Sequence, residues 1–310
     1  MRDAFLATLL PLAKKNKNFV LITGDLGFKV LDPFRHQLPS QFINAGVSEQ
    51  NMAMMAAGMA QEGKKVFTYS IGNFPTLRCL EMIRNDICAH NLDVKIVCVG
   101  GGFSYGALGA SHHATEDLSI MRSLSNMTVF CPGTLDEVKI LTLEAARMRT
   151  PCYLRLDKDG GWTSKVSAPV KIGMPRQYVK GNKLTLLATG GVLSEVEKAL
   201  CILKKDAIHP SVIGMHTLQP ANPASLRKMV KSSKAILTIE ENCQRGGLAA
   251  CLMESLVGGA VGVKRIKHLG IKNAFLHPTG SQKYLRGKCG LLAHQLADAA
   301  KKIAGKTPDV

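Results

Sequence analysis

Side chains that can exchange protons or bind anions occur directly after several apolar runs of this sequence. Each run has the length and composition of a buried strand. Ligands of an open parallel sheet bind at the carboxyl ends of its strands, so we expect these side chains on one edge. A carboxylate, an imidazole and a cation there could support proton transfer and bind an anionic substrate. The residues, each with the run before it, are Asp25 (Phe19–Thr23), Glu49 (Gln41–Ala45), His112 and His113 (Lys95–Val99) and Lys158 (Cys152–Arg155).

Each of these residues also has an ordinary structural explanation. Glu49 follows Ser48, a good helix N-cap, and a carboxylate in the first helical turn suits the helix dipole. Asp25 can be a turn residue, and Phe74 can be part of a core. The adjacent histidines lack a cysteine or an HxxxH partner, so we expect no metal site in this chain.

The elements that must position these side chains alternate between strand and helix patterns. Strands that are apolar throughout and separated by helices are typical of a parallel sheet covered on both faces. In the first half, the remaining expected strands are Lys65–Tyr69 and Thr128–Phe130, and the expected helices are Ser48–Gln61, Phe74–His90 and Leu135–Met148.

The second half repeats this alternation on a smaller scale. Between the halves, residues 161–183 are rich in Lys, Gly and Pro and show no helical period, which predicts a linker. We therefore expect an α/β protein with two doubly wound, mainly parallel domains at residues 1–160 and 184–310. The expected strands of the second domain are Leu184–Ala188, Ser211–Gly214, Ala235–Ile239 and Lys264–His268, and its helices are Ser194–Lys205, Pro223–Val230 and Gly247–Leu256.

Composition narrows the class of protein. The 310 residues are 46% hydrophobic and 20% charged, which excludes a disordered chain. The nine cysteines form no CxxC pair, which favours a reduced, cytoplasmic protein. Ala4–Ala13 is apolar, but a basic run follows it, so we expect an amphipathic helix and no export signal. No apolar run is long enough to span a membrane.

The net charge of +17 is concentrated in the second half of the chain. Residues 1–160 hold 17 Lys/Arg and 15 Asp/Glu, whereas residues 161–310 hold 23 and 8. A basic half can bind nucleic acid, an anionic substrate or an acidic partner, or can be a solvated face. Aromatic residues make up only 5%, so stacking on single-stranded nucleic acid is not expected.

Several short stretches, in this order and spacing, resemble the C-terminal portion of transketolase over nearly the whole chain. The first half resembles the pyrimidine-binding domain of thiamine-diphosphate enzymes, and the second half resembles the transketolase C-terminal domain. The stretches are GVSEQNM (Gly46–Met52), Gly24-Asp25, FPTLRCLEMIRND (Phe74–Asp86), GASHHATEDL (Gly109–Leu118), FCPG (Phe130–Gly133), LTLLATG (Leu184–Gly190) and Glu240–Leu248.

The resemblance implies roles in binding thiamine diphosphate. Glu49 matches the carboxylate that bonds N1′ of the aminopyrimidine ring and favours the tautomer that activates the cofactor. Phe74 matches an aromatic residue that stacks on that ring, and Ile71 stands where many transketolases have a second one. Asp25 matches an acid near the thiazolium ring. His112 matches a histidine that exchanges a proton with the reacting hydroxyl.

The substrate-binding set differs from the family pattern. Lys158 stands near an arginine that binds the substrate phosphate, and Lys lacks its bidentate fork. Arg155 and His113 are neighbouring candidates. Leu108 stands where an aspartate usually contacts a sugar hydroxyl. One of the glycines at 101 and 102 stands near a further substrate histidine. These differences predict a ketose or acceptor outside the standard set.

The resemblance also implies a second polypeptide. The family binds the diphosphate and Mg²⁺ through a separate domain with Gly-Asp-Gly and Asn-Asn, and this chain has no Asn-Asn. We therefore expect an N-terminal transketolase-like subunit to hold both, in an α2β2 heterotetramer. The predicted function is transfer of a two-carbon ketol unit from a ketose to an aldehyde.

Two alternatives remain open from the sequence. The chain could be the β-subunit of a 2-oxoacid dehydrogenase or a deoxyxylulose-phosphate-synthase-like enzyme, both of which share the glutamate. It could also be a non-catalytic binding protein that uses its basic half.

Overall fold

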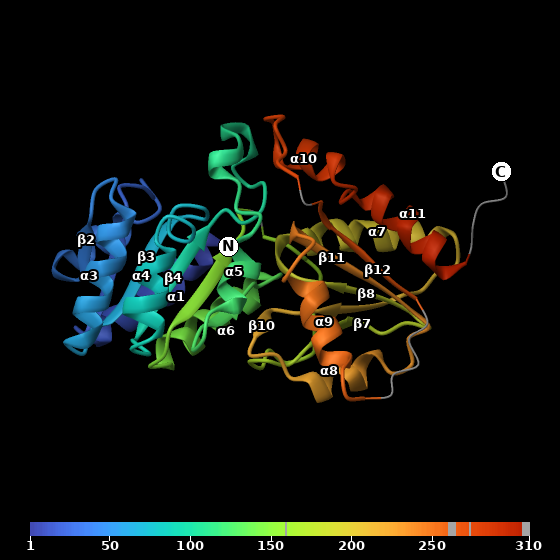
Figure 1. The fold of residues 1–310 in the computed structure, drawn as a ribbon, viewed down its shortest axis with the longest axis horizontal. Coiled ribbons are helices and arrows are strands. Elements are labelled where there is room, and N and C mark those ends of the chain that lie inside the picture. The colour runs from blue at the N-terminus through green and yellow to red at the C-terminus, as the bar shows by residue number, and fades with distance from the viewer. Residues whose placement is uncertain (159, 260–264, 273, 306–310) are drawn as a thin grey trace.

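The apolar runs form two sheets that lie side by side (Figure 1), in a computed structural model that describes all residues except 159, 260–264, 273 and 306–310. The strands pair in parallel apart from β10 with β5 and β7 with β9. The seven-stranded sheet has the order β10 (Thr217–Gln219), β5 (Thr128–Phe130), β6 (Cys152–Leu156), β4 (Val94–Val99), β3 (Lys65–Ile71), β1 (Phe19–Thr23) and β2 (Phe42–Asn44). The five-stranded sheet has the order β12 (Arg265–Ile271), β11 (Ala235–Cys243), β8 (Leu184–Ala188), β9 (Ser211–Gly214) and β7 (Arg176–Val179).

Helices cover both faces of each sheet, which confirms the expected α/β fold of two doubly wound, mainly parallel layers. On the first sheet, α1 and α6 pack on one face through residues such as Phe5 and Leu141, and α3 packs on the other through Met52 and Ala56. On the second sheet, α7 and α11 share one core and α8 and α9 lie opposite. These helices are α1 (Arg2–Lys15), α3 (Glu49–Gln61), α6 (Leu135–Arg147), α7 (Leu193–Lys205), α8 (Pro223–Val230), α9 (Leu248–Leu256) and α11 (Ala293–Ala304).

Shorter helical segments complete the two layers. They are α2 (Asp32–Gln37), α4 (Leu80–Met82), α5 (Asp117–Ser123), α10 (Gln282–Lys288), the 3-10 turns η1 (Pro39–Gln41), η3 (Gly106–Leu108), η4 (Ala110–His112) and η5 (Gly190–Val192), and the π-helix η2 (Ile83–Cys88).

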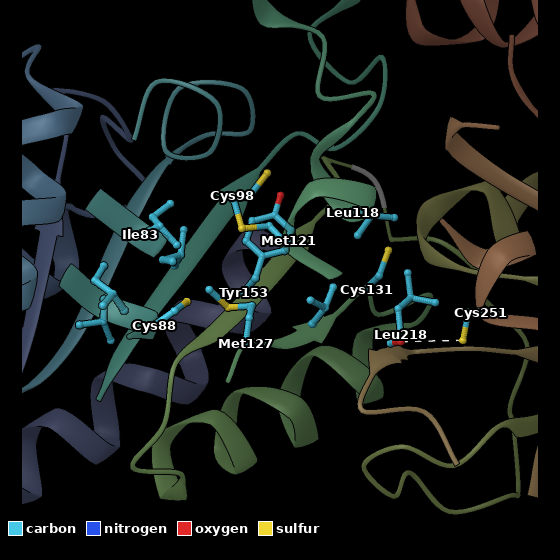
Figure 2. Close-up of a cluster of buried hydrophobic side chains, with 14 of the residues drawn as sticks. Ile83, Cys88, Cys98, Leu118, Met121, Met127, Cys131, Tyr153, Leu218 and Cys251 are labelled. Atoms are coloured by element: carbon cyan, nitrogen blue, oxygen red, sulfur yellow. Dashed lines mark hydrogen bonds between the residues drawn. The ribbon is translucent and has the colours of Figure 1, made fainter. Parts of the chain in front are cut away.

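One core continues from the first sheet into the second half of the chain. Figure 2 shows this row of side chains, from Ile83 through Met121 and Tyr153 to Leu218 and Cys251. The two halves also share a sheet, because β10 of the second half adds to the edge of the first sheet next to β5. This shared apolar burial holds the domains against each other.

Two segments differ from the sequence-based expectation. The helix expected over Phe74–His90 begins only at Leu80 and continues as the π-helix η2. Residues 74–79 form turns instead, in which Thr76 Oγ1 donates to Gly72 O at 2.7 Å. The expected linker, residues 161–183, contains β7, an edge strand of the second sheet. The domain limits themselves remain a prediction.

The expected strand Lys264–His268 is β12, which begins at Arg265; Lys264 lies outside the described residues. Across the described parts of the chain, every helix is too short or too polar to cross a membrane.

Candidate functional site

The candidate site lies along the carboxyl edge of the first sheet, where β1, β2, β3, β4 and β6 are neighbours. Glu49 is the first residue of α3, directly after the carboxyl end of β2. Its side chain is only 2% exposed, and Arg78 Nη1 donates to Glu49 Oε2 at 2.9 Å. Among the described residues, none donates a hydrogen bond to the other oxygen, Oε1. The sheet therefore presents a buried carboxylate with one oxygen bound and one available.

The Glu49 carboxylate lies close to Gly24, which directly follows β1. A Cβ added at Gly24 would make ordinary contacts with it, at 3.4 Å from Cγ and 3.5 Å from Oε1. Ser48 occupies the N-cap position of α3, but its side chain makes no capping hydrogen bond. The helix end is therefore not capped in the expected way, and the first-turn carboxylate is the group placed near its positive dipole.

Asp25 is held in the left-handed region, with φ of 56°, at the end of β1. Asn44, the last residue of β2, bridges the two strand ends. Its Nδ2 donates to Asp25 Oδ1 at 2.8 Å, and its Oδ1 accepts from the backbone N–H groups of Asp25 at 3.1 Å and Gly46 at 3.0 Å. Sequence reasoning missed Asn44, although a polar residue ending an apolar strand marked it.

Phe74 and His112 meet at the same edge, from two different loops. Their rings are 5.0 Å apart in an edge-to-face arrangement, and Arg78 lies over the Phe74 ring at 5.2 Å. Ile71 is half-buried at the end of β3, and its carbonyl accepts from Phe74 N–H at 2.9 Å. Ser111 Oγ lies 3.0 Å from His112 Nδ1. The hydroxyl therefore engages one ring nitrogen and leaves Nε2 for another partner.

His113 is buried, whereas its neighbour His112 is half-exposed. It is 5% exposed, and its ring meets Phe103 edge-to-face at 5.1 Å. Burial lowers the pKa of His113, so its imidazole is held neutral. It lines a cavity of about 280 Å³ together with Phe103, Glu116 and Phe275.

The two cationic candidates lie in different environments. Lys158 is exposed after the carboxyl end of β6. Arg155, inside β6, is 3% exposed and bound by its own chain: Nη2 donates to Ala114 O at 3.2 Å and to Glu241 O at 2.7 Å, and Nε lies 3.4 Å from Asp117. The guanidinium of Arg155 thus joins the loop after β4 to the second domain.

The glycines at positions 101 and 102 have a packing reason. A Cβ on Gly101 would lie 1.9 Å from Arg155 Nε. A Cβ on Gly102, whose φ is +58°, would lie 2.5 Å from Glu241 Cγ. A histidine side chain has no room at either position, because Arg155 and Glu241 already occupy that space.

Glu241, in the second domain, binds the loop after β4. Its carboxylate accepts from Arg286 Nε at 2.7 Å, from Phe103 N–H at 2.8 Å and from Gln282 Nε2 at 3.1 Å. Within the described ranges, no group of three or more His, Cys, Asp or Glu side chains could hold a metal ion.

Comparison with known proteins agrees with both halves of the structure. Residues 1–160 match the family described as transketolase, pyrimidine binding domain, and residues 175–287 match the transketolase C-terminal domain. The chain is 34% identical over 279 residues to a putative transketolase C-terminal section of Methanocaldococcus jannaschii, covering 89% of this chain and 87% of that protein. It is 31% identical over 268 residues to an apulose-4-phosphate transketolase subunit of Phocaeicola vulgatus, covering 86% of each.

A solved structure of a split gene transketolase, in the form of an inactive beta4 tetramer, is also similar. It shares 28% identity with a TM-score of 0.84, and the match covers 99% of this chain and 98% of that one. Each of these three matches covers most of both proteins. The chain belongs to the transketolase family, as a subunit that carries the pyrimidine-binding and C-terminal domains of a split, transketolase-like enzyme.

Proposed function

We propose that this chain forms the pyrimidine side of a thiamine-diphosphate site and transfers a two-carbon ketol unit only when joined to a partner subunit. The observation that carries the proposal is the buried Glu49 carboxylate, whose Oε1 accepts no hydrogen bond from the described residues. That oxygen fits the N–H of a protonated or imino-tautomer pyrimidine ring. When bound, the cofactor would supply a thiazolium ring that acts as the electron sink for carbon–carbon cleavage.

The neighbours of Glu49 fit the rest of such a ring. Phe74 supplies an aromatic face that is still half-exposed at this edge. Ile71 adds an apolar contact, and Asp25 lies at the end of the adjacent strand β1. This chain therefore supplies the residues that would contact the pyrimidine half of the cofactor.

For the substrate, we assign His112 as the residue that exchanges a proton with a sugar hydroxyl, through Nε2. His113 is buried and held neutral. It therefore contributes to substrate binding through the shape of the loop and through hydrogen bonding by one of its ring nitrogens, and not through charge. Lys158 is the exposed cation available for an anionic substrate group. Arg155 acts indirectly, since its guanidinium holds the loop that carries His112.

The diphosphate and Mg²⁺ require a partner. The described part of this chain offers no metal-ligand cluster, and the sequence has no Asn-Asn. A relative of nearly the same length is itself named as one subunit of a transketolase, which supports a second subunit. We propose an N-terminal transketolase-like subunit as that partner, in a cytoplasmic α2β2 assembly with the cofactor between the subunits.

The proposal is tested with the chain co-expressed with its N-terminal partner. Calorimetry with thiamine diphosphate and Mg²⁺ is expected to show binding to the pair and not to either subunit alone. Ketoses with and without phosphate, each with aldehyde acceptors, then serve as substrates. Glu49→Gln is expected to reduce ketol transfer by about 100-fold or more, because the amide cannot replace the carboxylate in tautomer control.

The matched control is Glu62→Gln, an exposed carboxylate just past the end of the same helix. It is expected to leave transfer unchanged. Equal activity of the Glu49→Gln and wild-type pairs, or absence of cofactor binding by the pair, would exclude the proposed function.

A further inference from the structure

Arg78 connects two of the residues proposed to contact the pyrimidine ring. Its Nη1 donates to Glu49 Oε2 at 2.9 Å, and its guanidinium lies over the Phe74 ring at 5.2 Å. The arginine side chain is 50% exposed, whereas the Glu49 side chain is 2% exposed. A surface cation therefore reaches inward to a buried carboxylate.

We propose that Arg78 is a positioning residue that fixes which oxygen of the Glu49 carboxylate faces the cofactor. The proposal rests on the proposed role of Glu49. Arg78 is assigned no contact with the cofactor itself.

The first argument concerns charge. Burying a charged carboxylate costs free energy unless an opposite charge or hydrogen bonds compensate. Arg78 is the described side chain that supplies an opposite charge to Glu49. Without Arg78, the buried position of this carboxylate would lose that compensation.

The second argument concerns direction. Arg78 binds Oε2 and leaves Oε1 without a donor from the described residues. The contact with the Phe74 face restrains the guanidinium plane from a second side. Lysine has a single charged nitrogen and no plane to stack, so it would supply the charge without the same orientation.

The test measures thiamine-diphosphate affinity of the reconstituted pair by calorimetry at neutral pH. Arg78→Met is expected to weaken binding about tenfold, equivalent to about 1.4 kcal/mol. Arg78→Lys keeps the charge but loses the planar guanidinium, so it is expected to regain the affinity only in part.

Arg84→Met is the matched control, since Arg84 is an exposed arginine on the next helical segment that bonds only to its neighbour Asn85 among the described residues. It should bind the cofactor as the wild type does. Thermal unfolding of each variant shows whether it is folded, and Arg78→Lys replaces Arg78→Met if the latter is not. In that case, cofactor binding weaker than that of the wild type is the expected result.

A double-mutant cycle with Glu49→Gln separates this proposal from the proposed function. If Arg78 acts through Glu49, adding Arg78→Met to Glu49→Gln costs no further affinity. An equal loss in both backgrounds, or wild-type affinity for Arg78→Met, overturns the role of Arg78 alone. Wild-type affinity for Glu49→Gln overturns the role of Glu49 and that of Arg78 with it.

Discussion

Glu241→Gln should destabilise the protein because it leaves a buried arginine without its main counter-charge. Glu241 lies in β11 and is 4% exposed, and Arg286 Nη2 lies 2.6 Å from its carboxylate. The amide keeps the shape and one acceptor oxygen, which Phe103 N–H can still use, but its NH2 group replaces the oxygen that accepts from Arg286. The change therefore removes both the charge and that acceptor.

The expected cost follows from the burial of both partners. Removing one member of a buried ion pair typically costs about 3–5 kcal/mol. We expect the lower end, about 3 kcal/mol, because the negative charge of Asp157 also contributes to raising the pKa of Arg286 and remains in the variant. Equilibrium urea unfolding measures this difference directly. Amide hydrogen exchange should also speed up at Phe103, whose N–H bonds to Glu241.

The control is Glu144→Gln, which breaks the 2.6 Å pair of Glu144 with Arg147 on the surface of α6. Those side chains are 31% and 72% exposed, so the expected cost is at most about 0.5 kcal/mol. The reasoning is refuted if Glu241→Gln loses less than about 1 kcal/mol, or if the two variants are equally stable.

Further changes test other parts of the structure. Gly101→Ala should lower the free energy of unfolding in urea by about 2 kcal/mol or more, because its Cβ would lie 1.9 Å from Arg155 Nε. Gly58 lies within α3, and a Cβ there would have no atom within 4 Å. Gly58→Ala should therefore raise the free energy of unfolding by up to about 1 kcal/mol. Burial raises the pKa of Glu240 from 4.5 to about 7, so the native state binds this proton more tightly and stability falls as pH rises through that window. Glu240→Gln should remove that fall in stability, measured by urea unfolding at a series of pH values. Burial lowers the pKa of His268, so the rise of stability with pH that His268 contributes should remain. An unchanged pH dependence of stability in Glu240→Gln would contradict the role given to Glu240.

The strands could be predicted from the sequence because most are buried on both faces and appear as apolar runs. Phe19–Thr23, Thr128–Phe130 and Leu184–Ala188 begin and end as expected. β7 and β10 were missed because they are short edge strands, each paired antiparallel to one neighbour. Their stability comes from tertiary pairing, which leaves little local pattern to detect.

The position of the candidate site followed from the sequence, but its internal contacts did not. Strand ends predicted the edge on which Glu49 and Asp25 lie. Arg78 was hidden in a stretch expected to be helical, where its direction could not be judged. Arg155 was expected at the substrate, yet its position inside β6 directs it to the second domain. Contacts between distant segments decide both cases, and sequence spacing does not reveal them.

The second domain also contributes to the candidate site. It holds the loop after β4 at several points: Glu241 accepts from Phe103 N–H at 2.8 Å, Cys243 N–H donates to Thr115 O at 2.6 Å, and Gly280 N–H donates to Gly106 O at 3.2 Å. These bonds lie on both sides of the segment that carries His112. Because both ends of this loop are hydrogen-bonded to the second domain, its middle is the part with the fewest such restraints. Changes in the second domain should therefore alter the position of His112 without touching the Glu49 carboxylate.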